Sequence, residues 1–565
     1  MSTSISVAQR PDTFTFLSFG GWLTLDPARA YDAASLHVLT NVYETLFTFR
    51  HAATRGVQPL LAQTVPTLEN GLIRDDGLRY RIPIREGVRF HSGDLLTADD
   101  VAYSLRRFLI TNAPDGPTHT LLDPLFGTPT LDDEALAFAD VAEAIRAEDN
   151  ALLLTLHKRC APFLAVLAAW SYTLNQQWAT ALGEWPGTAE SLQNYTARAR
   201  ASTALDRTAN GTGPFQFVRW DADGRTVVLE RFEGYWRGPA RLRIVEICYV
   251  EDIENRLRKL EAGEVDYAVA ARKFEPALRA MPGVTVVDGL PELNINPAIC
   301  FTFVIDGADN PAIGSGRLDG QGIPPNFFQD QHVRRAFAYA FDYQRFIDEA
   351  FGGKALPPQG PFPPGLQGYR SDRPYYRHDL ARAAEELKQA WGGAAWEHGF
   401  RFTMYTLEGN AMRARGCQIL KEGLKQLHPR IHIETQPLAW PAFNRTIRAH
   451  RAPIFWAAAY ADYPDAHTFA FDFLHSGGSI ARAQRFHNPI LDSLVDEAVA
   501  ELDPTRRTAL YERIADLAVE ELPQIYTAHR IGFAPLRTWV RGYKFDPHTP
   551  GLFYYHDLWK EVEGT

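Results

Sequence analysis

The sequence predicts a mixed α/β protein in which subdomains are inserted into one another. Strand patterns and amphipathic helix patterns alternate irregularly along the chain, so the strict strand-helix order of a barrel is not expected. The chain has 565 residues, which corresponds to about three folded units at about 100 to 200 residues per domain. Hydrophobic residues make up 45% and charged residues 22% of the chain. This composition is typical of globular proteins and excludes bulk disorder, collagen and coiled coil.

The first clear elements are a strand and a capped helix. Residues 80–90 alternate polar and apolar side chains, as a half-buried strand does. Thr97 then stands where it can cap a helix, and Asp100 at the third helical position makes a near capping box. The apolar face of this helix is predicted to consist of Val101, Leu105 and Phe108.

A hairpin and three further capped helices follow. Residues 215–220 and the β-branched run 226–229 flank a turn and predict an antiparallel hairpin. Asp330 and Asp379 each precede an amphipathic stretch and are predicted to cap its helix. Asp503, followed by proline, is predicted to start another helix. These are packing elements and carry no chemistry of their own.

Charge and hydropathy exclude several kinds of partner. The formal net charge is −10, so no basic excess points to nucleic acid. The longest apolar stretch, 161–170, has about 10 residues, whereas a membrane helix needs about 20. Residues 1–6 lack the basic and apolar regions of an export signal. We therefore expect either a cytosolic protein or a mature form from which the signal has been removed.

No catalytic motif is found, so we expect a protein without enzymatic activity. The chain has no Gly-x-Ser-x-Gly elbow, no His-Glu-x-x-His, no Walker loop and no dinucleotide-binding glycine motif. Its 17 histidines are scattered, and its four cysteines are far apart, so neither a metal nor a cofactor is expected. We expect buried free thiols, with one structural disulfide as the alternative. A hydrolase of peptides or glycosides stays open, because the separation of two carboxylates cannot be read from sequence.

The most informative segment is 455–466. It consists of an apolar strand that ends in Asp462, followed by an aromatic residue, a proline and Asp465. Ligand groups often bind at strand ends, where a partly buried carboxylate can pair with a cationic group. The alternative is that Asp462 caps the following helix or forms an Asx turn. Trp440, earlier in the chain, is either a core residue or a pocket wall.

Six motifs in order resemble one family, the extracytoplasmic solute-binding proteins of ABC importers, in the dipeptide, oligopeptide and nickel group known as family 5. The likeness covers nearly the whole chain. The motifs are Pro59-Leu60-Leu61-Ala62, residues 85–93 followed by 97–101, Gly211-Thr212-Gly213-Pro214-Phe215, Tyr235-Trp236-Arg237-Gly238, residues 261–266, and Val333 to Asp342.

The resemblance implies a type II periplasmic-binding-protein fold of two lobes, with an extra domain inserted in lobe one. Lobe one would consist of residues 10–48, 208–290 and 536–565, the inserted domain of 49–207, and lobe two of 291–535. A peptide or other small solute would bind between the lobes and be delivered to an ABC permease in the membrane. The resemblance also implies a monomer in the periplasm or on the outer face of the cytoplasmic membrane, with its signal sequence removed.

The resemblance also implies ligand-binding residues. The carboxylate of the Ala-Asp-Tyr motif pairs with the α-ammonium group of a peptide in the family's oligopeptide binders, and here that carboxylate belongs to Asp462. The indole of Trp440 would line a side-chain pocket. The further residues expected in the site are Tyr460, Ala461, Tyr526, Tyr31 and Asp32.

One departure from the family pattern concerns the ligand carboxylate. Dipeptide binders carry an arginine where this chain has Leu407 and Glu408, and the nearest arginines here are Arg413 and Arg415. A buried ligand carboxylate without a partner would cost several kcal/mol, which argues against strict dipeptide specificity. A longer peptide, a cationic ligand, an oligosaccharide, an opine and a metal chelate stay open. A cytosolic regulator that reuses the two-lobed sensor is disfavoured by the acidic charge and by the lack of a DNA-binding segment.

Overall fold

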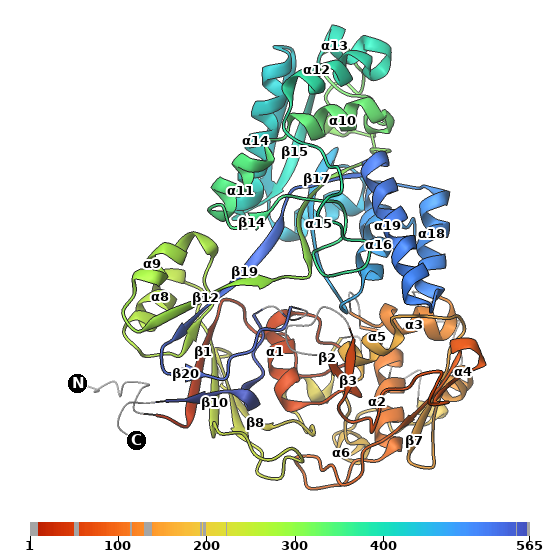
Figure 1. Cartoon of the computed structure of the whole chain (residues 1–565), viewed down its shortest axis with the longest axis vertical. Coiled ribbons are helices and arrows are strands. Elements are labelled where there is room, and N and C mark those ends of the chain that lie inside the picture. Colours follow the sequence, from red (N-terminus) through yellow and green to blue (C-terminus); the bar gives the residue numbers. More distant parts are fainter. Residues whose placement is uncertain are drawn as a thin grey trace. The chain divides into compact units, whose positions relative to one another are not determined.

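The computed structural model describes residues 10–49, 56–113, 116–128, 138–191, 195, 199, 201–221, 223–547, 549 and 551–561. The N-terminal residues on which the expectation about an export signal rests lie outside this part. The chain divides into two compact units, one of residues 1–290 with 532–565 and one of residues 291–531 (Figure 1). Both boundaries fall within strands, namely β12 (Val284–Pro291) and β19 (His529–Arg537).

Unit 1 is built on a sheet with the strand order β12-β19-β11-β1-β10-β9-β8. The strands not yet given are β1 (Thr13–Ser18), β8 (Phe215–Trp220), β9 (Thr226–Arg231), β10 (Ile244–Tyr249) and β11 (Tyr267–Ala268). β1 is parallel to both β10 and β11, whereas β9 is antiparallel to β8 and β10. The predicted hairpin of β8 and β9 is therefore confirmed.

The two faces of this sheet are covered by different helices. Phe14 and Phe16 of β1 share a buried core with residues of α1 (Ala33–Val42). Leu17 points to the opposite side, where it packs with residues of α8 (Ile253–Glu261) and α9 (Glu275–Ala280). This alternation is the period-2 pattern of a strand that is buried on both faces.

A glycine motif packs closely against the end of α1. Gly211 lies so near the end of α1 that an added Cβ would stand 2.0 Å from the carbonyl oxygen of Val42. The N–H of Gly213 donates to the same oxygen at 3.0 Å. The motif Gly211 to Phe215 therefore reflects a close backbone approach that only glycine permits.

Unit 1 also contains a second sheet, with the order β4-β5-β7-β6. Its strands are β4 (Ile73–Arg74), β5 (Arg79–Pro83), β6 (Ile145–Glu148) and β7 (Ala151–Thr155), and α2 (Ala98–Thr111) packs on β6 and β7. The capping box of Thr97 and Asp100 is confirmed. The strand predicted over 80–90 is shorter than expected, because β5 ends at Pro83 and Gly87 turns the chain with a φ of 77°. The other elements are β2 (Phe47–Phe49), β3 (Val57–Pro59), α3 (His119–Phe126), α4 (Phe138–Ala144), α5 (Phe163–Trp170), α6 (Gln176–Ala181), β20 (Val540–Arg541) and β21 (Trp559–Lys560).

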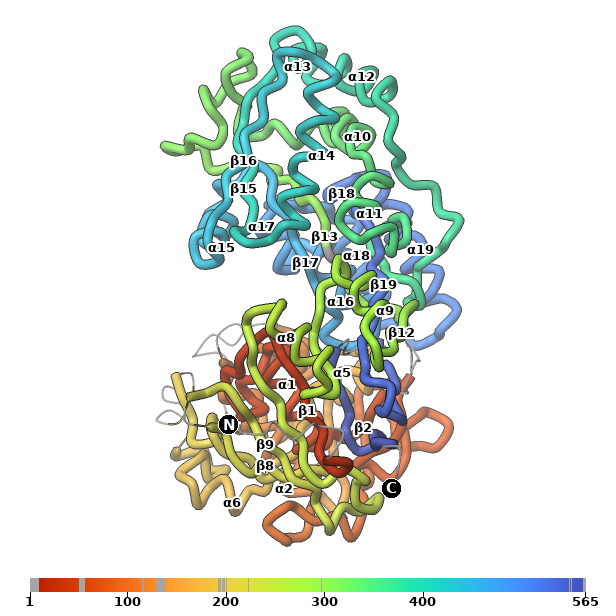
Figure 2. Tube along the Cα trace, turned by 90° about the vertical axis from the view of Figure 1, so that its left-hand side faces the viewer, coloured from red at the N-terminus to blue at the C-terminus, as the bar shows by residue number. Residues whose placement is uncertain are grey.

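Unit 2 has a three-stranded antiparallel sheet and a parallel strand pair. β13 (Asn294–Phe301) lies between β17 (Ile454–Tyr460) and β18 (Gln524–Tyr526). β15 (Phe400–Leu407) and β16 (Ile431–Leu438) run parallel, and α14 (Ala411–Leu427), which joins them, packs on both strands (Figure 2). The short β14 (Ala355–Leu356) pairs with the start of β19. The remaining helices are α10 (Gln331–Ala340), α11 (Tyr343–Phe351), α12 (Leu380–Gln389), α13 (Ala394–His398), α15 (Trp440–Arg448), α16 (Ala466–Leu474), α17 (Ser479–Gln484), α18 (Pro489–Ala500) and α19 (Pro504–Glu521).

The predicted helix starts in unit 2 are confirmed. The side chains of Asp330, Asp379 and Asp503 accept backbone N–H bonds at the first turns of α10, α12 and α19. All four cysteines are free, three of them buried and Cys248 half-buried, so the alternative of a structural disulfide is wrong. Within the described residues, no helix combines the length and apolar character needed to cross a membrane.

Candidate functional site

The segment after β17 is held at both ends by backbone hydrogen bonds. β17 ends at Tyr460, and the N–H of Ala461 donates to the carbonyl oxygen of Leu293 at 3.2 Å. Four residues further on, the N–H of Asp465 donates to the carbonyl oxygen of Tyr463 at 2.7 Å. The turn 461–465 is thus a defined structure that presents Asp462 at the end of a strand.

Asp462 does not cap the following helix. The cap of α16 is Asp465, whose Oδ1 accepts the N–H of His467 at 2.8 Å. The capping alternative for Asp462 is therefore wrong, because a carboxylate three residues later takes that role. Asp462 itself is half-buried, and its place in a ligand site stays a prediction.

Asp465 is anchored from another helix by Arg507. The two Nη atoms of Arg507, on α19, lie 2.7 Å from the two carboxylate oxygens of Asp465. Both side chains are almost completely buried. Burial alone would raise the pKa of Asp465, but the charge and hydrogen bonds of Arg507 prevail and hold that pKa below its usual value.

Two of the aromatic residues expected in the site have side chains that are largely exposed. Tyr460 has 53% of its surface exposed, and Trp440, the first residue of α15, has 56% exposed. The Trp440 ring stacks on Phe443 with centroids 6.3 Å apart. Trp440 is therefore not a core residue, and its open face is available for stacking.

Unit 2 also contains a charged side chain that was not among the expected site residues, that of Arg413 in the first turn of α14. Only 8% of Arg413 is exposed, and no acceptor in the described residues contacts its guanidinium, whose Nε is fully buried. Burial holds its pKa below the usual value, and the neighbouring Cys300, Cys417 and Tyr460 counteract this only in part. Arg415, two residues on, instead pairs with Glu349.

Arg413 differs in this respect from every other buried arginine in the part of the chain that the structure describes. A buried cation without a counter-charge or acceptors is costly, so arginines inside proteins are usually paired. Among the described residues, five of the six buried arginines follow this rule. The partners are Asp26 and Glu184 for Arg107, carbonyl oxygens for Arg256 and Arg334, Asp516 for Arg373, and Asp465 for Arg507. Sequence reasoning had no signal for this exception, because pairing depends on neighbours in space.

Tyr526 is placed differently from the other expected site residues. It lies in β18 with only 3% of its surface exposed. Its hydroxyl donates to Oε1 of Gln524 at 2.9 Å, and its N–H donates to the hydroxyl of Tyr375 at 2.8 Å. Its polar groups are thus engaged within unit 2, and a position beside a ligand stays a prediction.

Tyr31 and Asp32 belong to unit 1, directly before α1. Tyr31 is 42% exposed, and its ring lies 5.7 Å from that of Trp170. Asp32 caps α1, because its Oδ1 accepts the N–H of Ser35 at 2.9 Å. Its other oxygen, Oδ2, is buried and has no hydrogen-bond partner within the described residues. One carboxylate oxygen of Asp32 thus has a hydrogen-bond donor, and the other can accept a hydrogen bond from a further donor.

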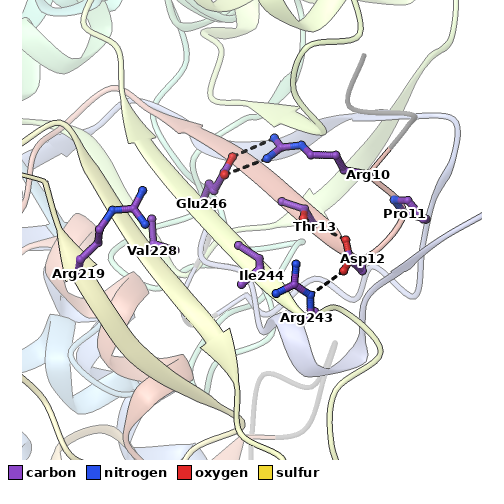
Figure 3. A pocket seen from close by; sticks show the side chains of 9 residues that line it. All are labelled: Arg10, Pro11, Asp12, Thr13, Arg219, Val228, Arg243, Ile244 and Glu246. Carbon is purple, nitrogen blue, oxygen red and sulfur yellow. Dashed lines mark hydrogen bonds and ion pairs between the residues drawn. The ribbon is translucent and has the colours of Figure 1, made fainter. Parts of the chain in front are cut away.

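Unit 1 also contains a polar hollow of about 660 Å³ that none of the expected site residues line. Figure 3 shows that two of its arginines, Arg10 and Arg243, face carboxylates. Arg10 donates to both oxygens of Glu246 at 2.9 and 3.0 Å, and Arg243 donates to Asp12 at 2.8 Å. These charges are largely matched within the hollow. Elsewhere in the described chain, no group of three or more histidine, cysteine, aspartate or glutamate side chains could hold a metal ion.

Comparison with known proteins gives one family match. The family described as "Bacterial extracellular solute-binding proteins, family 5 Middle" matches residues 56–480. Among curated relatives, Heme-binding protein A of Haemophilus influenzae is 26% identical over 558 residues, which cover 96% of this chain and 92% of the relative. Di/tripeptide-binding protein 2 of Pseudomonas aeruginosa is 27% identical over 568 residues, which cover 97% of this chain and 95% of the relative.

A solved structure shares the fold. The periplasmic binding protein DppA of Helicobacter pylori, an ABC-transporter-associated protein in complex with the peptide STSA, matches with a TM-score of 0.73 at 21% identity. The match covers 98% of this chain and 100% of that protein. The two-lobed architecture that the family resemblance implies is therefore confirmed.

Proposed function

The chain belongs to the bacterial extracellular solute-binding proteins of family 5, and from this premise we propose that its solute is an oligopeptide-like zwitterion held by Asp462 and Arg413. Proteins of this family are not enzymes; they capture a solute outside the cytoplasmic membrane for an ABC importer, whose permease is their partner. The chain has the type II fold of that family.

The single observation that carries the proposal is the nearly buried side chain of Arg413, whose Nε has no acceptor within the described residues. An anionic ligand group would supply the missing acceptors, and a carboxylate matches the guanidinium geometry with two parallel hydrogen bonds. The sequence has no arginine at Leu407 or Glu408 to bind a ligand carboxylate. The carboxylate would instead bind Arg413, six residues after Leu407. Tyr460 supports a common site, because its side chain is one of the groups that influence the pKa of Arg413.

The opposite end of the ligand is assigned to Asp462. A half-buried carboxylate at the end of β17 suits an α-ammonium group, since a charge-assisted hydrogen bond gains strength where water is excluded. The exposed rings of Tyr460 and Trp440 would pack against the ligand side chains. Ala461 is proposed to line the site with its backbone. Its small side chain leaves room for the ligand beside Asp462. Tyr31 and Asp32 of unit 1, and Tyr526 of unit 2, are proposed as further contacts.

The alternative solutes fit the described residues less well. A neutral oligosaccharide would leave Arg413 without an anion, and a metal chelate finds no ligand cluster among the described residues. An opine carries carboxylates and would satisfy Arg413, so it is the second candidate. The relatives differ in the solute their names give, haem in one and di- or tripeptides in the other, so membership in the family does not select among these.

We also propose the domain division 10–48, 208–290 and 536–565 for lobe one, 49–207 for the inserted domain and 291–535 for lobe two. The sheet β4-β5-β7-β6 and helix α2 all fall within 49–207, separate from the larger sheet of unit 1, which supports the inserted domain. The protein is proposed to act as a monomer, without nucleic acid, after removal of its signal sequence.

The test is to identify the solute directly. Protein purified under native conditions is analysed by native mass spectrometry for a co-purified ligand, and a thermal-shift screen compares tripeptides, octopine, maltotriose and nickel–histidine complexes. A ligand that binds only the folded state raises the melting temperature in proportion to the logarithm of its concentration. We expect peptides to co-purify and to raise it most. If only sugars or metal chelates do so, the peptide proposal is wrong.

A further inference from the structure

The turn that carries Asp462 ends at a buried carboxylate, that of Asp465. The carboxylate of Asp465 accepts the N–H of His467 in the first turn of α16, while the backbone N–H of Asp465 donates to the carbonyl oxygen of Tyr463. These two contacts hold the chain directly after Asp462 and the start of the next helix. Any change in the position of Asp465 is therefore passed to the turn 461–465.

Asp465 takes its own position from Arg507, which lies 42 residues later on α19. The guanidinium of Arg507 has a defined orientation, because its Nε donates to the carbonyl oxygen of Ala498 at 2.9 Å and one Nη donates to the hydroxyl of Tyr511 at 3.2 Å. It then holds both oxygens of Asp465. A fork of two parallel hydrogen bonds restricts the carboxylate in direction as well as in distance.

We propose that Arg507 is a positioning residue for recognition of the ligand's ammonium group, and that it acts through Asp465 on the turn bearing Asp462. Arg507 is 5% exposed and makes no ligand contact in this proposal. The inference rests on the proposed function, in which Asp462 pairs with an amino terminus. Loss of the fork lets the turn sample other conformations, and the ammonium contact weakens more than the contacts made elsewhere.

The experiment measures discrimination between peptides that differ only at the amino terminus. A pool of tripeptides with free amino termini and the same pool after N-acetylation are dialysed to equilibrium against the full chain, and bound peptide is quantified by mass spectrometry. We expect the wild-type protein to prefer the free pool by about 30-fold or more, as a desolvated ammonium–carboxylate contact implies. In Arg507→Met this ratio should fall to about threefold or less, because the contact is no longer pre-organised.

Two further variants separate positioning from a loss of stability. Arg507→Lys keeps a charge but loses the fork, so its ratio should lie between the other two. Arg373→Met, the matched control, removes another buried arginine of unit 2, the partner of Asp516. It should weaken folding without changing the ratio. If Arg507→Met does not fold, Arg507→Lys and Asp465→Asn carry the comparison.

The outcomes distinguish this inference from the proposed function. If the wild-type protein discriminates and the Arg507 variants keep the full ratio, Arg507 is only structural and the inference is overturned while the function stands. The same holds if Arg373→Met lowers the ratio as much as Arg507→Met does. If the wild-type protein binds neither pool, the proposed function fails and the inference fails with it.

Discussion

Arg107 and Asp26 form a bidentate ion pair that is completely enclosed in unit 1. The two Nη atoms of Arg107 lie 2.7 and 2.6 Å from the two carboxylate oxygens of Asp26, and neither side chain is exposed. Glu184 contacts the same guanidinium at 2.9 Å. The pair connects α2, which carries Arg107, to the loop after β1. It thereby joins the two halves of unit 1.

Replacing Arg107 by leucine should strongly destabilise unit 1. The substitution leaves Asp26 and Glu184 buried without their cation, and breaking a buried pair on one side typically costs about 3 to 5 kcal/mol. Urea unfolding followed by tryptophan fluorescence measures the loss. Arg159→Leu is the matched control, because that arginine pairs with Asp76 at the surface, where the effect of an ion pair is small. Equal midpoints for the two variants would contradict the prediction.

The next prediction concerns pH and Glu44. This carboxylate is fully buried, and burial raises its pKa to about 7 although Trp236, Tyr235 and Thr212 donate hydrogen bonds to it. The native state thus binds the proton more tightly than the unfolded state. The stabilising contribution is complete below about pH 4.5 and is lost as the pH rises through about 7. The total change is about 3 kcal/mol.

The variant Glu44→Gln should remove this dependence, because glutamine keeps an acceptor and cannot ionise. Buried histidines act in the opposite sense: burial lowers the pKa of His91 and His529 to about 4, so their contribution is lost as the pH falls. The measurement is therefore the difference in unfolding free energy between variant and wild type at pH 5 and pH 8. A difference that is the same at both pH values would show that Glu44 does not titrate in this range.

Local signals predicted helix starts well, whereas pairing in space was not predictable. The caps at Thr97, Asp330 and Asp503 were found because a cap and its helix are contiguous in sequence. The central strand of unit 2, β13, contains Pro297 and was missed. A proline disfavours a central strand, and here a register shift between Ile295 and Ala298 accommodates it.

The same limit applies to the candidate site. The segment around Asp462 was identified from its position after an apolar strand. Asp465 caps α16 because it directly precedes Ala466, the first residue of that helix. The sequence could not show that Arg507, far along the chain, binds the same carboxylate. Arg413 was not predicted as a site residue for a related reason. Its significance is the lack of an acceptor within the described residues, which depends on neighbours in space and not on neighbours in sequence.

An exposed and a buried tryptophan should respond oppositely to truncation. Trp440 is 56% exposed, so Trp440→Ala should leave the unfolding free energy nearly unchanged and weaken peptide binding by about 1 kcal/mol or more through lost stacking. Trp456 is 1% exposed, in β17, so Trp456→Ala should cost about 3 to 5 kcal/mol of stability. Calorimetric titration and urea unfolding measure the two quantities. Unchanged affinity in Trp440→Ala would exclude that ring from the site.

Asp462→Ala should weaken binding of peptides with free amino termini by about 2 to 5 kcal/mol, because the ligand ammonium is left unpaired in a desolvated site. Because Asp465 caps α16, folding should be little affected, and Asp462→Asn should give an intermediate loss. Titration calorimetry with one tripeptide compares the three proteins. An unchanged affinity in Asp462→Ala would remove this residue from the site.

Arg413→Met should have opposite effects on stability and on binding. Without ligand, the wild-type protein keeps a cation in a nearly buried place that offers it no acceptor among the described residues. Methionine has a similar volume and no charge, so the free variant should be more stable by about 1 kcal/mol or more. With ligand, the variant lacks the donor for the carboxylate and should bind a free-acid tripeptide at least about tenfold more weakly. Binding of the carboxamide form of that peptide should change little.

Urea unfolding of the free proteins and calorimetric titration with both peptides measure these effects, and Arg415→Met, at a surface pair with Glu349, is the control. A variant that is less stable and binds both peptides equally weakly would show that Arg413 is a packing residue rather than an anion site.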